Sequence, residues 1–386
     1  MTPRRRLLKV LSVVGARPNF IKLAPLARAL ARRRGVEHLI VHTGQHYDRE
    51  MSEVFLQGLD LPRPHCNLVV GSASHAQQTA TIMQRFEPVC LRARPDIVLV
   101  YGDVNSTLAV ALVAAKLGIK VGHIEAGLRS GDWSMPEEIN RVLTDRLADL
   151  LFTPSRDAES NLRVEGIPQD RIHFVGNIMI DSLVRLLPQA RARNGDNPRP
   201  HGSGPYVVVT LHRPANVDDP DTLRELLAAL SALSEQRQII FPVHPRTRAR
   251  LQAMSWRPPG HRVTLLDPVS YLDMLSLVLD SDLVITDSGG LQEETSFLGI
   301  PCLTVRPNTE RPITCTEGTN RLVAADGAEI GRAARAAWAG RRPTPPSIER
   351  WDGNTAERIA AVLCDGGARA ATVVAAEREI ASPTPA

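Results

Sequence analysis

Aromatic side chains are scarce in this sequence, at 4% of 386 residues, although apolar residues as a whole reach 43%. A core made from these residues is therefore mainly aliphatic. The cysteines are odd in number, lie far apart and form no CxxC pair. This spacing indicates neither a disulfide framework nor a zinc site, so we expect no metal site and a reducing, cytoplasmic location.

Long apolar runs and a strong charge are missing too. No run approaches the ~18 apolar residues of a membrane span, so we expect no membrane partner. The formal net charge is only +4 and the arginines are scattered, which does not favour nucleic acid as a partner. An anionic small molecule is the simpler expectation.

Two cofactor signatures are also absent. The sequence contains neither GxGxxG nor GxxxxGK[ST], which disfavours a dinucleotide redox enzyme and a P-loop ATPase. We therefore expect no cofactor.

Short apolar runs alternate with helical patterns along the whole chain, and a length of 386 residues favours two domains. The alternation starts afresh after the breaker-rich segment 194–205. It predicts an α/β protein with two Rossmann-like domains facing across a cleft, at 1–176 and 177–386, whose last helix, about 352–365, packs back on the first domain. The expected strands are 7–14, 38–42, 97–101, 119–123, 150–153, 172–175, 206–211, 239–243, 263–266 and 283–286.

Carboxylates follow the expected strands of the first half. Asp103 comes after the run 97–101, and Glu125 comes after 119–123. Ligands of open α/β sheets bind at the carboxyl ends of the strands, so both acids are candidate site residues. Glu137 begins a later helix, where the helix dipole or an ion pair with Arg141 explains it equally well.

Anion-binding features occur in both halves. Arg17 and Lys22 lie in GARPNFIK, where a turn expected over 15–19 leads into a helix expected over 20–33. In the second half, the strand 283–286 leads into DSGGLQEE and a helix expected over 291–297. The two glycines before it allow close approach to the free N–H groups of that helix. A phosphate or diphosphate is the expected ligand. The same residues would also fit a tight turn with a capping serine and no ligand.

The ordered motifs resemble the non-hydrolysing UDP-N-acetylglucosamine 2-epimerases, of the glycosyltransferase-B fold. They are GARPNFIKLAPL, TGQH, GDVNSTLA, HIEAGLRS, MPEEINR, VGN, LHRPANVD, PVHP, DSGGLQEE and ERPITCTEGTN. The resemblance implies reversible C2 epimerisation of UDP-GlcNAc to UDP-ManNAc by anti elimination of UDP and its readdition to 2-acetamidoglucal. It also implies a homodimer that serves cell-surface polysaccharide biosynthesis.

The resemblance also assigns residues. As catalytic residues it implies Asp103, Glu125, Glu137 and His212. For binding of the UDP-sugar it implies Arg17, Lys22, Arg213, Ser288, Gly289, Gly290, Glu294 and Arg311. No added redox cofactor is implied.

Two questions stay open at this stage. Many members have a regulatory substrate site, for which Gln45, His46 and His244 match here, whereas the arginine expected before Gln78 is Gln77. Related UDP-2-acetamido sugars are alternative substrates, and a glycosyltransferase of the same fold is an alternative enzyme.

Overall fold

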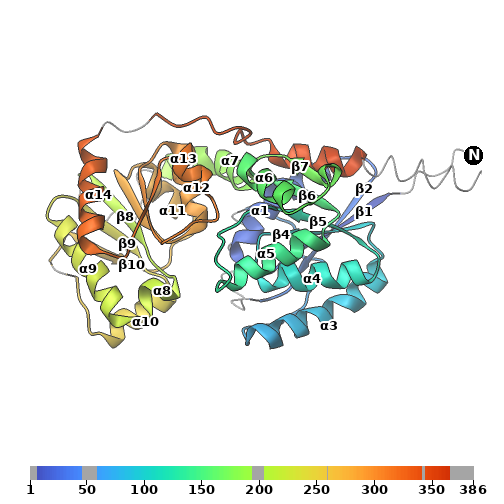
Figure 1. Ribbon diagram of the computed structural model, residues 1–386, viewed down its shortest axis with the longest axis horizontal. Coiled ribbons are helices and arrows are strands. Elements are labelled where there is room, and N and C mark those ends of the chain that lie inside the picture. Colours follow the sequence, from blue (N-terminus) through green and yellow to red (C-terminus); the bar gives the residue numbers. More distant parts are fainter. Residues whose placement is uncertain (1–6, 46–58, 194–203, 259, 341–343, 366–386) are drawn as a thin grey trace, which may run out of the picture. The chain divides into compact units, whose positions relative to one another are not determined.

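The structure is a computed structural model that describes residues 7–45, 59–193, 204–258, 260–340 and 344–365 (Figure 1). It divides into two compact units. The N-terminal unit comprises Met1–Leu128, Asp132–Ser182 and Asp352–Ala386, and the C-terminal unit comprises Arg129–Gly131 and Leu183–Trp351. The division expected from the sequence lies at 176/177, whereas in the structure it falls between Ser182 and Leu183, inside a helix. Most of the breaker-rich segment 194–205 lies outside the described residues.

The described part of the N-terminal unit contains a seven-stranded parallel sheet of order β3-β2-β1-β4-β5-β6-β7. β4 is buried along its whole length, as expected of an apolar strand covered on both faces. Chain order reverses between β1 and β4, and ligands of such sheets bind at this switch point. The strands are β1 (Leu8–Val14), β2 (Val36–His42), β3 (Cys66–Asn67), β4 (Ile97–Tyr101), β5 (Lys120–Ile124), β6 (Leu150–Thr153) and β7 (Ile172–Phe174).

Helices connect these strands, and α3, α4 and α5 pack side by side (Figure 1). α5 begins with Pro136, whose ring suits the first turn because no intrahelical N–H is needed there. The helices are α1 (Arg17–Ala31), α3 (His75–Ala93), α4 (Asn105–Lys116), α5 (Pro136–Leu147), α6 (Arg156–Val164), the 3-10 helix η1 (Gln169–Arg171) and α7 (Ile178–Ala192).

A last helix, over 355–365, belongs to the N-terminal unit. The Asp181 carboxylate accepts its first N–H groups, from Thr355 at 3.1 Å and Ala356 at 2.7 Å. Burial raises the pKa of Asp181 to about 6. Arg358 donates to the Val175 carbonyl at 3.0 Å, so the returning chain is bound at two points.

The described part of the C-terminal unit contains a six-stranded parallel sheet of order β10-β9-β8-β11-β12-β13. Its switch point lies between β8 and β11. The strands are β8 (Tyr206–Thr210), β9 (Gln238–Pro242), β10 (Val263–Leu266), β11 (Leu283–Thr286), β12 (Cys302–Val305) and β13 (Asn320–Val323). The helices are α8 (Pro214–Val217), α9 (Pro220–Ser234), α10 (Pro245–Ala253), α11 (Tyr271–Leu279), α12 (Gly289–Leu298), α13 (Ile313–Thr316) and α14 (Gly327–Ala339).

Several element boundaries differ from the sequence predictions. β5 is shifted by one residue, and α1 begins at Arg17 where the sequence predicted Phe20. The Asn19 side chain explains the early start, because its Oδ1 accepts the N–H groups of Gly15 and Ala16. α12 likewise begins at Gly289, so both glycines of DSGG belong to its first turn. Among the described residues, no helix is long and apolar enough to cross a membrane.

Candidate active site

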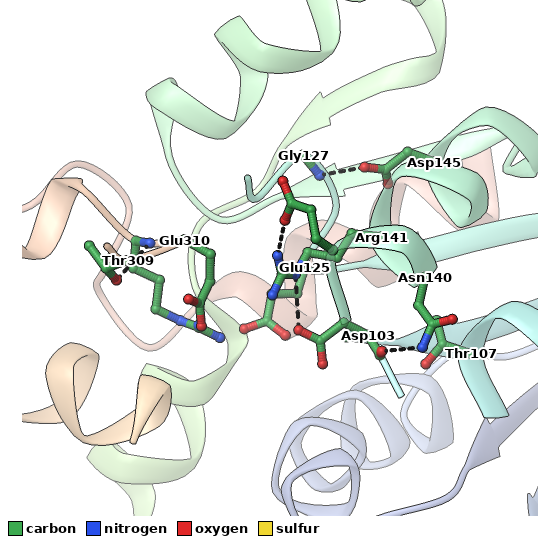
Figure 2. A network of polar contacts seen from close by, with 12 residues as sticks. Asp103, Thr107, Glu125, Gly127, Asn140, Arg141, Asp145, Thr309 and Glu310 are labelled. Carbon is green, nitrogen blue, oxygen red and sulfur yellow. Dashed lines mark hydrogen bonds and ion pairs between the residues drawn. The ribbon is translucent and has the colours of Figure 1, made fainter. Parts of the chain in front are cut away.

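Asp103 lies just beyond the carboxyl end of β4. Its Oδ2 accepts a hydrogen bond from Nε of Arg141 at 3.0 Å, and its backbone carbonyl accepts one from Asn140 Nδ2 at 2.9 Å. Figure 2 shows both contacts, which come from the same helix, α5. The Asp103 side chain is 27% exposed. The carboxylate is therefore held by a guanidinium on one side and is open to solvent on another.

Glu125, just beyond β5, forms an ion pair with Lys22 of α1, and both side chains are buried. The ammonium offsets the loss of hydration that a buried carboxylate suffers. Gly102 makes room for the pair, because a Cβ there would lie 2.9 Å from Lys22 Nζ. Glu125 itself has a φ of 73°, a left-handed backbone that non-glycine residues adopt mainly under local constraint.

Glu137 and Glu138, in the first turn of α5, have different environments. Glu137 is exposed, whereas Glu138 is buried and pairs with Arg141. The prediction of an ion pair between Glu137 and Arg141 is therefore wrong, because Glu138 is the partner. Arg141 points towards the core, and the residue three positions before it shares that buried face.

His212 lies beyond β8 in the C-terminal unit, where its Nδ1 is 2.8 Å from Oδ1 of Asp287. Asp287 is fully buried and also accepts the N–H groups of His212 at 2.9 Å and Arg213 at 2.8 Å. Burial raises the pKa of Asp287, but the hydrogen bonds and charge of His212 outweigh it and hold that pKa below its usual value. Asp287 is not among the residues predicted for the site, although it follows a buried strand as Asp103 does.

Ser288 is the N-cap residue of α12, and Gly289 and Gly290 form the start of the helix. All three are half-buried, so this turn is partly accessible to solvent. The first N–H groups of a helix have no partner within the helix. A Cβ on Gly289 would lie 2.6 Å from Nη1 of Arg311. Arg311 in turn pairs with Glu293, at 2.9 Å, and with Glu310. A helix N-terminus and a fixed guanidinium thus adjoin, as an anion site requires.

Glu294 projects from the same helix, and its Oε1 accepts a hydrogen bond from Tyr271 Oη at 2.7 Å. Burial raises the pKa of Glu294 to about 7, and the charge of Glu293 adds to this. Tyr271 was not singled out in the sequence. Its hydroxyl orients the carboxyl group, which can bind ligand hydroxyls with its other oxygen.

The described candidate regulatory residues, Gln45 and His244, belong to different units. Gln45 is buried in the N-terminal unit, and its Oε1 accepts from the Ser106 hydroxyl at 2.7 Å. His244 caps α10 in the C-terminal unit, and its ring lies 5.4 Å from that of His212. His46 lies outside the described residues, and Arg17 is the first residue of α1.

Comparison with solved structures shows which class of protein this fold belongs to. The crystal structure of Methanocaldococcus jannaschii UDP-GlcNAc 2-epimerase in complex with UDP-GlcNAc and UDP has a TM-score of 0.85, at 39% identity, over 92% of this chain and 99% of that chain. The two parallel sheets with their interleaved helices are thus Rossmann-like domains of the glycosyltransferase-B-like fold. Acids at strand ends in one unit, and a glycine-rich helix start beside Arg311 in the other, are typical of a nucleotide-sugar enzyme.

The sequence match is more specific. The family model of UDP-N-acetylglucosamine 2-epimerase matches residues 28–364, and the chain belongs to this family of isomerases. The M. jannaschii protein named UDP-N-acetylglucosamine 2-epimerase is 42% identical over 82% of this chain and 88% of its own. A Pseudomonas aeruginosa protein named UDP-2,3-diacetamido-2,3-dideoxy-D-glucuronate 2-epimerase is also 42% identical, over 82% and 89%. The resemblance drawn from the motifs is confirmed.

Proposed function

We propose that this protein interconverts UDP-GlcNAc and UDP-ManNAc as a non-hydrolysing 2-epimerase. The observation that carries the proposal is the pair of acids at neighbouring strand ends, Asp103 and Glu125, each beside its own cation. Membership of the family supports the same reaction.

The reaction inverts C2 without a net oxidation. A base takes the proton from C2, the C1–O bond to UDP breaks with its electron pair, and a C1=C2 double bond forms. UDP then adds back to C1 as a proton reaches the opposite face of C2. No hydride leaves the sugar, so the scheme needs no redox cofactor. Carboxylates near C1 and C2 stabilise the oxocarbenium-like charge and move the proton.

The residues divide between two tasks in this proposal. Asp103, Glu125 and Glu137 handle the C2 proton and the charge at C1. His212 acts at the departing diphosphate, and the remaining binding residues hold UDP, with Glu294 on the ribose hydroxyls. These binding residues are Arg17, Lys22, Arg213, Ser288, Gly289, Gly290 and Arg311.

Incubation of the purified protein with UDP-GlcNAc alone, in D2O, tests the proposal by NMR. We expect UDP-ManNAc that carries deuterium at C2, with UDP and 2-acetamidoglucal as minor species. Free ManNAc would identify a hydrolysing enzyme instead. Absence of turnover without an acceptor would favour a glycosyltransferase.

The comparison with a Pseudomonas relative favours a second candidate substrate, a UDP-2,3-diacetamido sugar acid. The Pseudomonas relative, named for a UDP-2,3-diacetamido sugar acid, matches this chain as well as the M. jannaschii relative does, at 42% identity. The ratio of kcat/KM for the two UDP-sugars decides between them, because discrimination is a difference in transition-state binding.

We also propose that the protein is a cytoplasmic homodimer. Its five cysteines are all free, which fits a reducing compartment. Ile139 and Leu143 of α5 are exposed, and Ile139 lines a pocket of about 390 Å³ together with residues of α3 and α4. A second copy covering this apolar face would remove it from water. Light scattering after size exclusion measures the mass, and replacement of Leu143 by Glu should shift it towards the monomer.

A further inference from the structure

His123 and Asp145 form a fully buried pair in the N-terminal unit. Nδ1 of His123, on β5, lies 2.6 Å from Oδ1 of Asp145, on α5. The other ring nitrogen, Nε2, lies 2.8 Å from the carbonyl oxygen of Gly102. A carbonyl only accepts, so Nε2 carries a proton and donates it. Oδ2 of Asp145 accepts the N–H of Gly127 at 3.1 Å (Figure 2).

The two peptides bound by this pair adjoin the two acids. Gly102 directly precedes Asp103, and Gly127 follows Glu125 by two positions. Both glycines have left-handed backbones, with φ of 64° and 82°. A Cβ on Gly127 would lie 2.3 Å from the Ala158 carbonyl oxygen, so this turn packs closely on α6. Glycine adopts these and many other backbone conformations readily, so the hydrogen bonds from His123 and Asp145 help to select one conformation for each turn.

The bond between His123 and Asp145 contains one proton, and the pair is neutral as a whole whichever atom holds it. The cost of burial is therefore smaller than for a lone charge, while loss of one partner leaves the other unpaired. Arg141, which binds Asp103, lies one turn before Asp145 on α5. Helix α5 thus binds the Asp103 side chain directly, through Arg141. It holds the Gly102 carbonyl indirectly, because Asp145 of α5 binds His123 and His123 binds that carbonyl.

We propose that His123 and Asp145 are positioning residues for proton transfer at C2. They touch no substrate, and they hold the ends of β4 and β5 so that Asp103 and Glu125 keep their mutual placement. The inference rests on the proposed epimerase function. A misplacement of about 1 Å in a reacting group can lower the rate about 100-fold, which sets the expected size of the effect.

The test compares Asp145→Asn, His123→Gln and His123→Leu with the wild-type protein. We expect Asp145→Asn to lower kcat about 100-fold, with KM for the UDP-sugar and Kd for UDP within about threefold. His123→Gln keeps an N–H for the Gly102 carbonyl and should retain more activity than His123→Leu, which matches it in size. Asp149→Asn is the control, since Asp149 accepts the Val121 N–H at the opposite end of β5.

Melting temperatures and UDP affinity separate positioning from folding. If Asp145→Asn does not fold, the comparison of His123→Gln with His123→Leu decides. A kcat within about threefold of wild type in Asp145→Asn overturns the inference. Equal activity of the two His123 variants does so too. An inactive wild-type protein, by contrast, would refute the proposed function and not the positioning.

Discussion

The Nδ1 atom of His212 lies 2.8 Å from a carboxylate, Asp287, that has no exposed surface. This contact leaves Nε2 as the ring nitrogen available to a ligand, because the partner of one nitrogen determines the role of the other. Asp287 also accepts two backbone N–H groups and Nδ2 of Asn216, at 3.1 Å. It therefore holds the imidazole and the backbone after β8 together.

Asp287→Asn tests this arrangement. The amide removes the charge and presents N–H groups where the native side chain accepts, so the imidazole loses its orientation. We expect kcat to fall about 100-fold, the scale of a misplaced catalytic group. Asp219→Asn is the matched control, because Asp219 caps the exposed start of α9. Wild-type activity in Asp287→Asn would show that His212 needs no such support.

Removal of charge from the acids tests the proposed chemistry. Asp103→Asn keeps the side-chain shape, and we expect turnover to fall about 100-fold or more, the scale of lost acid–base catalysis. Glu125→Gln should lower activity similarly but also lower the melting temperature, because it leaves the buried Lys22 ammonium without its carboxylate. UDP affinity, measured by calorimetry, should largely survive in both variants. Full activity of Asp103→Asn would show that the chemistry lies elsewhere.

Gly289→Ala tests the anion site. The new Cβ would lie 2.6 Å from Nη1 of Arg311 and 2.9 Å from Oε1 of Glu310, so the guanidinium must move. We expect UDP affinity to fall about tenfold, the order of one lost hydrogen bond to a charged group. Gly327→Ala is the control, since Gly327 also begins a helix but its Cβ would meet nothing closer than 3.5 Å. Equal UDP affinity in the two variants would remove Arg311 from the site.

Glu294→Gln tests a dependence of stability on pH. Burial raises the pKa of Glu294 from 4.5 to about 7, so the folded state binds an extra proton between these values. Stability from this group is therefore greatest at low pH and is lost as the pH rises through the folded pKa. A glutamine never ionises, so the variant should gain stability relative to wild type as the pH rises from about 4.5 to about 7, and the difference should level off above that.

Denaturant unfolding of both proteins across this range measures that difference. Asp181, whose pKa is raised to about 6, is present in both proteins, and its contribution cancels in the comparison. A difference that does not change with pH would show that Glu294 titrates normally. UDP affinity of the same variant reports separately on the ribose contact.

Strands were the best predicted elements. β4, β6, β10 and β11 have the bounds expected from the sequence, because a buried parallel strand is a short apolar run between breakers. Helix starts were less accurate, since the Asn19 side chain lets α1 begin at Arg17 and both glycines of DSGG belong to the first turn of α12. Asp103 and Glu125 could be selected as candidates because each follows such a run. Their catalytic roles stay predictions.

The amino-acid order alone thus determined the α/β class, the family and the acids to test. Only the tertiary structure decided the partners of those acids. It joins Asp103 to Arg141, Lys22 to Glu125, and Asp287 to His212, across 38, 103 and 75 residues of sequence. Local pattern cannot specify such contacts, because each depends on which strands become neighbours and on the burial that makes a charged group need a partner.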